Sequence, residues 1–219
     1  MGRRDVTRDH AVDRLPLALG ATLCTLEPVE SGHHADGLSW LGDRGRDGGV
    51  DRVPLPHAQG VLSLCGKHAI GPSPESVVER HGVTTVVCLV EQHELLDRYP
   101  RYVEWLRSDE RHRRPGRSVE TVEAVWEPIH DLHAPTLDRA LALVDDVVAR
   151  LHHGEHVLIH CGAGIGRAGT VATLVLIALG MDEDEALRHV AAHRPMAGPE
   201  VGAQQELVRN AALALSERA

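Results

Sequence analysis

Apolar side chains recur at helical spacing between Pro135 and Gly154. Steps of three and four residues place five of them on one face of a helix: Leu137, Leu141, Val144, Val148 and Leu151. Proline is favoured near the start of a helix and glycine directly after its end, and both residue types stand at these positions. The pattern therefore predicts one amphipathic helix over residues 135–154.

Shorter apolar segments predict strands. Residues 83–90 (VTTVVCLV) are apolar on both faces, as a buried parallel strand is. Residues 156–160 (HVLIH) predict a second short buried strand, and residues 118–126 (SVETVEAVW) alternate like a third. Further helices are expected over 73–82, 96–110 (broken at Pro100), 167–180, 182–194 and 198–217.

Alternating strands and helices predict an α/β fold class, with a central, largely parallel sheet flanked by helices in a single domain. Glycine and proline recur from Leu15 to Gly71 without a helical period, so short strands and loops are expected there. Residues 1–14 are charged and aperiodic, which indicates a flexible N-terminal tail. The single domain is expected to span residues 15–219.

The composition narrows the classes of function. The 219 residues include 32 acidic and 23 basic side chains, and the formal net charge of −9 argues against a general binder of nucleic acid or of anionic membranes. The longest strongly apolar run, Val171 to Leu179, is too short to cross a bilayer. Four widely spaced cysteines, with no CxxC pair and no secretory signal, favour a reduced cytoplasmic protein.

A glycine-rich segment, HCGAGIGRAGT (residues 160–170), joins the strand at 156–160 to the helix at 167–180. Unpaired backbone N–H groups at a helix start attract anions, and glycines let the backbone curl so that these groups converge on one phosphate. Arginine adds a bidentate clamp. The expected phosphate-binding residues are Gly162, Ala163, Gly164, Ile165, Gly166 and Arg167.

The same positive field favours the thiolate form of Cys161, which makes this residue a nucleophile near neutral pH. Taken alone, Cys161 also fits a buried structural cysteine before a glycine turn. The combination of a strand, the Cys-x5-Arg spacing, the glycines and a helix favours catalysis or phosphate binding instead.

The segment HCGAGIGRAGT resembles the HCxxGxxR signature of the cysteine-dependent protein tyrosine and dual-specificity phosphatases. PIHDLHAP (128–135) looks like the general-acid loop of compact phosphatases related to cyclin-dependent kinase inhibitor 3. GLSWLGDRG (37–45) and EQHEL (91–95) resemble two other segments of that group, so the resemblance covers residues 37–215. It implies a protein tyrosine phosphatase-like fold and a phosphoprotein phosphatase. Such an enzyme hydrolyses phosphate monoesters of tyrosine, and of serine or threonine, through a cysteinyl-phosphate intermediate and without a cofactor.

A general acid must protonate the leaving oxygen and later activate water. Asp131 lies 30 residues before Cys161, in the segment that resembles the acid loop. The alternative is that Asp131 caps the following helix or ends a turn. Asp138, Asp145 and Asp146 lie within that helix and are poorer candidates.

The resemblance implies two further roles. His160 would orient the loop and support the thiolate, although a histidine at a strand end also fits a buried residue with satisfied hydrogen bonds. A glutamine at the start of a later helix would position the hydrolytic water. Gln204 fits that position better than Gln205, because Leu207 follows it by three residues; a solvent-exposed helical glutamine is the alternative.

One position departs from the family. A serine or threonine commonly follows the arginine, and its hydroxyl stabilises the thiolate as it leaves the phosphoenzyme. Ala168 stands here, and Thr170 faces elsewhere on a helix. The resemblance therefore implies slower breakdown of the intermediate, without loss of the initial attack.

The interior of the loop, GAGIG, is neutral, which favours a monophosphate on a protein side chain over a polyphosphorylated inositol. The basic segment 111–117 (RHRRPGR) fits a solvated loop better than a recruiting site. The histidine pairs at 33–34 and 152–153 lack convincing ligand spacing, so no metal is expected. The expected partner is a phosphorylated protein or a small phosphomonoester, with no nucleic acid and no membrane.

Other classes compete with this interpretation. A pseudophosphatase would bind phosphate without turnover, and a related enzyme would act on a non-protein phosphate monoester. Arsenate reductases share the Cys-x5-Arg spacing, but their loop opens the chain and resolving cysteines lie nearby. A rhodanese-like sulfurtransferase does not require the arginine at this spacing. The sequence assigns no role to Cys65 or Cys88.

Overall fold

The computed structural model describes residues 49–108 and 122–218. The tail expected at 1–14, the segment 37–45, the histidine pair 33–34 and the basic segment 111–117 lie outside the described residues. The described part contains a five-stranded sheet with the strand order β1-β2-β5-β3-β4. Its strands are β1 (Val50–Val53), β2 (Val61–Gly66), β3 (Thr85–Cys88), β4 (Glu123–Trp126) and β5 (His156–Cys161).

The sheet is largely parallel, which confirms the predicted fold class. β5 lies at its centre and pairs in parallel with β2 and β3, and β3 pairs in parallel with β4. Within the described residues, the antiparallel pairing is that of β1 with β2. The described residues of the weakly patterned segment 15–71 thus include the two strands β1 and β2, and Gly66 of β2 lies opposite Cys161 of β5.

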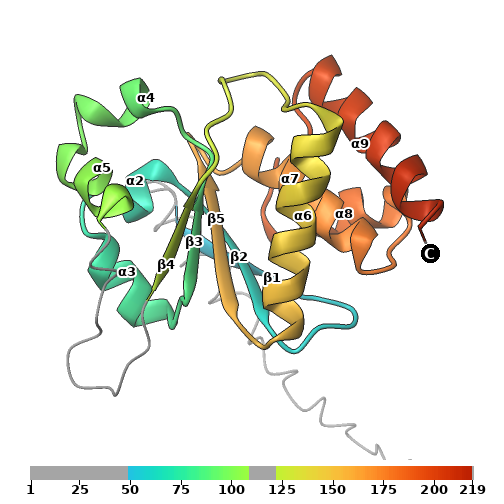
Figure 1. Ribbon diagram of the computed structural model, residues 1–219, viewed down its shortest axis with the longest axis horizontal. Coiled ribbons are helices and arrows are strands. Elements are labelled where there is room, and N and C mark those ends of the chain that lie inside the picture. The colour runs from blue at the N-terminus through green and yellow to red at the C-terminus, as the bar shows by residue number, and fades with distance from the viewer. Residues whose placement is uncertain (1–48, 109–121, 219) are drawn as a thin grey trace, which may run out of the picture.

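Two groups of helices cover the two faces of the sheet (Figure 1). One group comprises α6 (Leu137–His152), α7 (Gly166–Ala178), α8 (Glu183–His193) and α9 (Gly202–Ser216). The other comprises α2 (Lys67–Ile70), α3 (Pro74–His81), α4 (Gln92–Leu96) and α5 (Pro100–Arg107). Helix α5 begins at Pro100, where the sequence predicts a break, because proline suits the first helical turn. The predicted helices over 135–154, 167–180, 182–194 and 198–217 correspond to α6 to α9.

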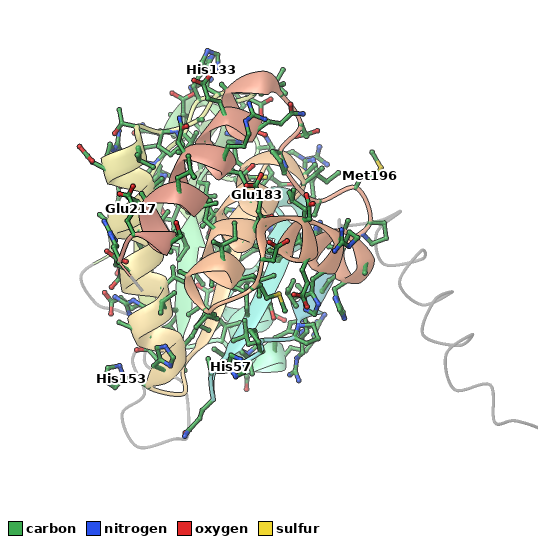
Figure 2. All side chains as sticks on the ribbon, turned by 90° about the vertical axis from the view of Figure 1, so that its right-hand side faces the viewer. His57, His133, His153, Glu183, Met196 and Glu217 are labelled. Atoms are coloured by element: carbon green, nitrogen blue, oxygen red, sulfur yellow. The ribbon has the colours of Figure 1, made fainter. Side chains whose placement is uncertain are left out.

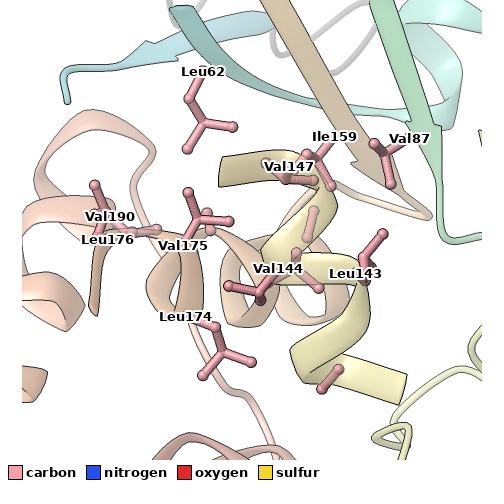
Figure 3. Packing of buried hydrophobic residues seen from close by; sticks show 14 of the residues in the cluster. Leu62, Val87, Leu143, Val144, Val147, Ile159, Leu174, Val175, Leu176 and Val190 are labelled. Atoms are coloured by element: carbon pink, nitrogen blue, oxygen red, sulfur yellow. The ribbon is translucent and has the colours of Figure 1, made fainter. Parts of the chain in front are cut away.

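Aliphatic side chains make up most of the core, since the chain contains no phenylalanine, and the buried rings of Tyr99, Tyr102 and Trp105 complete it. Along β5, Val157 and Ile159 belong to the cluster under α6 and α7, whereas Leu158 packs on the opposite face. Figure 3 shows part of the first cluster, where Val147 of α6 and Val175 of α7 meet the sheet. The central strand is therefore buried on both faces, as its apolar sequence predicts.

The carboxyl ends of β2, β3 and β5 meet at one edge of the sheet because these strands are parallel. Ligand sites of open α/β sheets lie at this edge. Figure 2 shows His133, from the loop before α6, at one end of the molecule and His153 at the other. Among the described helices, none is long and apolar enough to span a bilayer.

Candidate active site

The segment between β5 and α7 forms a tight loop over residues 162–165. Cys161 is the last residue of β5 and is 2% exposed, while Arg167 lies in the first turn of α7 and is 4% exposed. Gly164 has a φ of +72°, and a Cβ at this position would overlap the carbonyl oxygen of Cys65. Glycine is required here by both the conformation and the close approach. The expected phosphate-binding segment thus has the strand–loop–helix context that the sequence predicts.

Arg167 is held by a carboxylate to which the sequence analysis assigned no role. Its Nη1 and Nη2 donate to the two carboxylate oxygens of Glu94 at 2.7 and 3.0 Å, and Nη1 also donates to the carbonyl oxygen of Ile129 at 2.9 Å. Burial opposes the charge of Arg167, but the hydrogen bonds that it donates to Glu94 outweigh this effect and raise the pKa of the guanidinium. Likewise, Arg167 lowers the pKa of Glu94 although burial would raise it. The arginine is therefore a charged, fixed fork near the loop.

Asp131 lies beside this arginine. Its Oδ1 is 2.9 Å from Arg167 Nη2, and its side chain is 64% exposed, so the carboxyl group lies between the loop and solvent. The next residue, Leu132, has a φ of +58°, an uncommon conformation for leucine that marks a sharp turn. Thr136 rather than Asp131 is the N-cap residue of α6. The structure thus brings the predicted acid next to the predicted clamp.

His160 is fully buried in the sheet, directly before Cys161. Its Nε2 and the hydroxyl group of Tyr102 form a hydrogen bond of 2.6 Å. Burial lowers the pKa of His160 to about 3 and raises that of Tyr102 well above its ordinary value. Both side chains are therefore neutral near pH 7, and Tyr102 of α5 fixes the orientation of the imidazole ring.

Gln204 is buried, and its amide group is engaged on both sides. Its Oε1 accepts hydrogen bonds from the backbone N–H of Glu200 at 2.8 Å and from the hydroxyl group of Thr170 at 3.5 Å. Its Nε2 donates to the carbonyl oxygen of His133 at 3.1 Å. Gln204 thus links α9 to α7 and to the loop that carries Asp131. The exposed position considered as the alternative applies to Gln205 rather than to Gln204.

Two further features distinguish the start of α7. Ala168 is fully buried, and the hydroxyl group of Thr170 is directed to Gln204. A Cβ on Gly166 would overlap the carboxylate of Glu200, so this exposed side chain lies against the first residue of the helix. The helix dipole stabilises a carboxylate at this position.

The sequence analysis missed the parts that Glu94, Tyr102 and Glu200 play in this arrangement. Glu94 lies in the segment 91–95, whose resemblance to the phosphatases was a signal that could have led to it. No sequence spacing connects Tyr102 or Glu200 to the loop, because each reaches it only through the fold.

Cys65 and Cys88 lie on the two strands that flank β5, and both are registered with His160. Both are free, buried thiols. Burial raises the pKa of each, and that of Cys88 reaches about 12, so they are protonated and poorly reactive near neutral pH. In the described part of the chain, no group of three or more His, Cys, Asp or Glu residues is arranged to hold a metal ion.

Comparison with solved structures places this arrangement in a known fold. Tk-PTP in its active form is 27% identical with a TM-score of 0.54, and the match covers 77% of this chain and 98% of that one. PTPMT1 is 19% identical with a TM-score of 0.58, over 78% and 98% of the two chains. Kinase associated phosphatase (KAP) is 15% identical with a TM-score of 0.57, over 77% and 96%. The last two likenesses concern the fold alone.

No curated protein is a significant sequence match to this chain. The family model for the PTP-SAK group, described as a Swiss Army Knife protein with a DSP-PTPase phosphatase domain, matches residues 71–214. This range includes Cys161, Arg167, the loop that carries Asp131, and Gln204. The loop geometry, the fold and the family model agree with the resemblance seen in the sequence, and the chain therefore belongs to the DSP-PTPase family of cysteine-dependent phosphatases.

Proposed function

We propose that this protein is a phosphoprotein phosphatase that hydrolyses the monoesters of tyrosine, and of serine and threonine, through a cysteinyl-phosphate intermediate. The observation that carries the proposal is the contact of Asp131 with Arg167, which lies at the start of α7, six residues after Cys161. Nucleophile, clamp and acid then belong to one site. Glu94 supports the proposal because it holds the clamp in a single orientation.

In the first step, the thiolate of Cys161 attacks the phosphorus atom of the bound monoester. The S–P bond forms while the P–O ester bond breaks, and Asp131 gives its proton to the leaving oxygen. Arg167 and the backbone N–H groups of the loop bind the other phosphate oxygens, whose charge is spread in the transition state. The incoming phosphate replaces Asp131 as the partner of Arg167 Nη2.

In the second step, water attacks the phosphorus atom of the cysteinyl-phosphate. A P–O bond forms, the S–P bond breaks, sulfur leaves as the thiolate of Cys161, and Asp131 accepts the proton of water. The products are inorganic phosphate and the regenerated cysteine. The resemblance implies that Gln204 positions this water. Its Nε2 carries two N–H groups, one of which donates to the carbonyl oxygen of His133 in the loop that carries Asp131.

The neutral residues at 162–166 support a singly phosphorylated substrate. A structure of PTPMT1 in complex with PI(5)P shares the fold at 17% identity, so a phosphoinositide is the alternative class of substrate. The chain offers no lysine between Cys161 and Arg167 to match additional phosphates, which favours the protein monoester. The three free cysteines in the described residues suit the cytoplasm, the location that we propose.

Hydrolysis of para-nitrophenyl phosphate, with and without vanadate, tests the proposal. We expect vanadate-sensitive turnover in the wild type and none in Cys161→Ser. Cys88→Ser removes another buried thiol and is the matched control, which should keep its activity. A folded wild-type protein without vanadate-sensitive turnover would support a phosphate-binding pseudophosphatase instead. A panel of phosphopeptides and phosphoinositides then distinguishes the two classes of substrate.

The role of Asp131 has its own test. Asp131→Asn should lower the turnover of alkyl phosphates more than that of aryl phosphates with good leaving groups, by about 100-fold or more for the former, because only poor leaving groups need the proton. Asp138→Asn, an exposed carboxylate in the first turn of α6, is the control. Equal losses on both kinds of substrate would contradict a general-acid role.

A further inference from the structure

Arg194 is a fully buried charged side chain that the proposed chemistry does not use. It directly follows α8 and is 1% exposed, the bulkiest of the fully buried side chains in the described residues. Its Nε donates to the carbonyl oxygen of Gly164 at 2.5 Å, and its Nη2 donates to that of Ala163 at 2.8 Å. Its Nη1 binds Asp51 Oδ2 at 2.6 Å. One guanidinium group therefore joins the edge strand β1 to the middle of the loop.

The loop has a third anchor on this side. The backbone N–H of Lys67, at the start of α2, donates to the carbonyl oxygen of Gly162 at 3.0 Å. Three consecutive carbonyl groups, those of residues 162, 163 and 164, are thus each held by a donor outside the loop. A Cβ on Gly164 would overlap the Cys65 carbonyl oxygen and approach Arg194 Nη2 to 2.6 Å, so the loop is in close contact with this support.

Peptide geometry connects these carbonyl groups to the anion site. In a planar trans peptide, the carbonyl oxygen of one residue and the N–H of the next point in opposite directions. Holding the oxygens of Ala163 and Gly164 on the side of Arg194 therefore turns the N–H groups of Gly164 and Ile165 to the other side of the loop. Converging N–H groups are what an oxyanion needs from such a loop.

We propose that Arg194, fixed by Asp51, is a positioning residue that holds the loop in its anion-binding conformation. This inference rests on the proposed function, because it assigns the loop to phosphate. Arg194 acts through hydrogen bonds to the backbone and touches no substrate atom. Its charge is balanced by Asp51, so the orientation of its donors is what it contributes to the site.

The test measures oxyanion binding rather than turnover. Tungstate is titrated calorimetrically into the full-length Cys161→Ser protein and into the same protein with Arg194→Lys added. Lysine keeps the charge but cannot hold two carbonyl groups in the geometry of the guanidinium fork, so we expect tungstate affinity to fall about tenfold or more. Arg150→Lys is the matched control. This arginine of α6 also makes several hydrogen bonds, but it donates them to residues of β3 and β4 rather than to the loop. It should leave the affinity unchanged.

Amide hydrogen exchange gives a second readout that a purely structural role would not change selectively. Asp51→Asn leaves Arg194 in place but removes its carboxylate partner, so we expect faster exchange at residues 163–166 and about threefold weaker tungstate binding. Asp51→Asn therefore tests the positioning role even if Arg194→Lys fails to fold. Unchanged affinity and unchanged exchange in Asp51→Asn, or an equal loss of affinity in Arg150→Lys, would overturn the inference.

The outcomes separate this inference from the proposed function. If tungstate binding depends on Arg194 but the wild type hydrolyses no phosphate monoester, the positioning role is supported and the proposed function is overturned. Vanadate-sensitive turnover together with tungstate binding that does not depend on Arg194 would support the proposed function and overturn the positioning role. Absence of any tungstate binding by the folded Cys161→Ser protein would overturn the anion site itself.

Discussion

Ala168 leaves the first turn of α7 without a hydroxyl group directly after Arg167. If the cysteinyl-phosphate forms as proposed, nothing at this position stabilises the thiolate as it leaves. Ala168→Ser should therefore speed the breakdown of the intermediate by about two- to tenfold, the effect of one added hydrogen-bond donor at a developing charge.

Rapid-mixing kinetics with para-nitrophenyl phosphate measures this effect as a higher steady-state rate and a smaller burst of nitrophenol. Ala172→Ser, one turn further along the same buried helix, is the control and should change neither quantity. The explanation based on the missing hydroxyl would be wrong if burst and turnover were the same in Ala168→Ser as in the wild type.

His160 makes stability depend on pH in a defined window. Burial lowers its pKa from about 6.5 to about 3 in the folded protein, so the unfolded chain binds more protons between these values. The free energy of unfolding therefore has its full value, as far as His160 is concerned, above pH 6.5. It declines as the pH falls towards 3, by at most about 1.4 kcal/mol per pH unit.

Urea unfolding at pH 7.5, 6.5 and 5.5 tests this dependence in the wild type and in His160→Gln. The variant should lose stability less steeply on acidification, whatever its stability at neutral pH. His153→Gln alters an exposed histidine and should show the wild-type slope. Identical slopes in the wild type and His160→Gln would show that His160 is not the group responsible.

At the scale of elements, α7 combines an apolar sequence with a start that must approach other backbone closely. It is buried from Gly166 to Leu176, and the sheet, α6, α8 and α9 surround it. A Cβ on Gly169 would overlap the backbone nitrogen of Gly198, in the segment between α8 and α9. The Gly198 N–H in turn donates to the carbonyl oxygen of Ile165 at 3.3 Å. The glycine therefore sets how closely this segment packs against the start of α7.

Gly169→Ala should destabilise the protein by about 1–3 kcal/mol, because backbone atoms cannot move aside as a flexible side chain can. Gly202→Ala, at the exposed first residue of α9 where a Cβ meets no other atom, should be neutral or stabilising by up to about 1 kcal/mol. Chemical denaturation of both variants measures the difference. Equal stability of Gly169→Ala and the wild type would mean that the segment at Gly198 moves to accept the added Cβ without loss of stability.

At the scale of the whole molecule, Arg150 ties α6 to two strands at some distance along the chain. Its Nη1 and Nη2 donate to Glu123 of β4 at 2.9 Å each, its Nη1 donates to Thr85 of β3 at 3.2 Å, and its Nε donates to Asp146 at 2.9 Å. The hydrogen bonds that Arg150 donates to Glu123 raise the pKa of Arg150, although burial opposes this. The network joins the edge strand to the helix layer.

Arg150→Met should lower the free energy of unfolding by about 1–3 kcal/mol, a range limited by the partial exposure of the acidic partners. Arg218 pairs with Asp145 on the surface, and both side chains are at least half exposed, so Arg218→Met should cost less than about 0.5 kcal/mol. Urea unfolding at low and at high salt measures both variants. Equal losses of unfolding free energy in the two variants would show that Arg150 contributes no more than an exposed surface ion pair.

Much of the fold follows from local pattern. The strands β3 and β5 are short continuous apolar runs, and α6 repeats its apolar residues with the period of a helix; both patterns are properties of neighbouring positions. The segment 15–71 has no such period, so β1 and β2 could not be located in it. The position of β2 depends on pairing with β5, almost a hundred residues away, for which Ser63 and His156, at a sequence separation of 93, are an example, and β1 in turn pairs with β2.

The sequence by itself determined the alternation of strands and helices and the loop from Cys161 to Arg167, because each depends on residues close together in the chain. The tertiary structure alone decided what surrounds that loop. Glu94 lies 73 residues from Arg167, and Asp51 lies 143 residues from Arg194. These partners meet because strand order brings the carboxyl ends of β2, β3 and β5 to one edge, and no local pattern encodes that order.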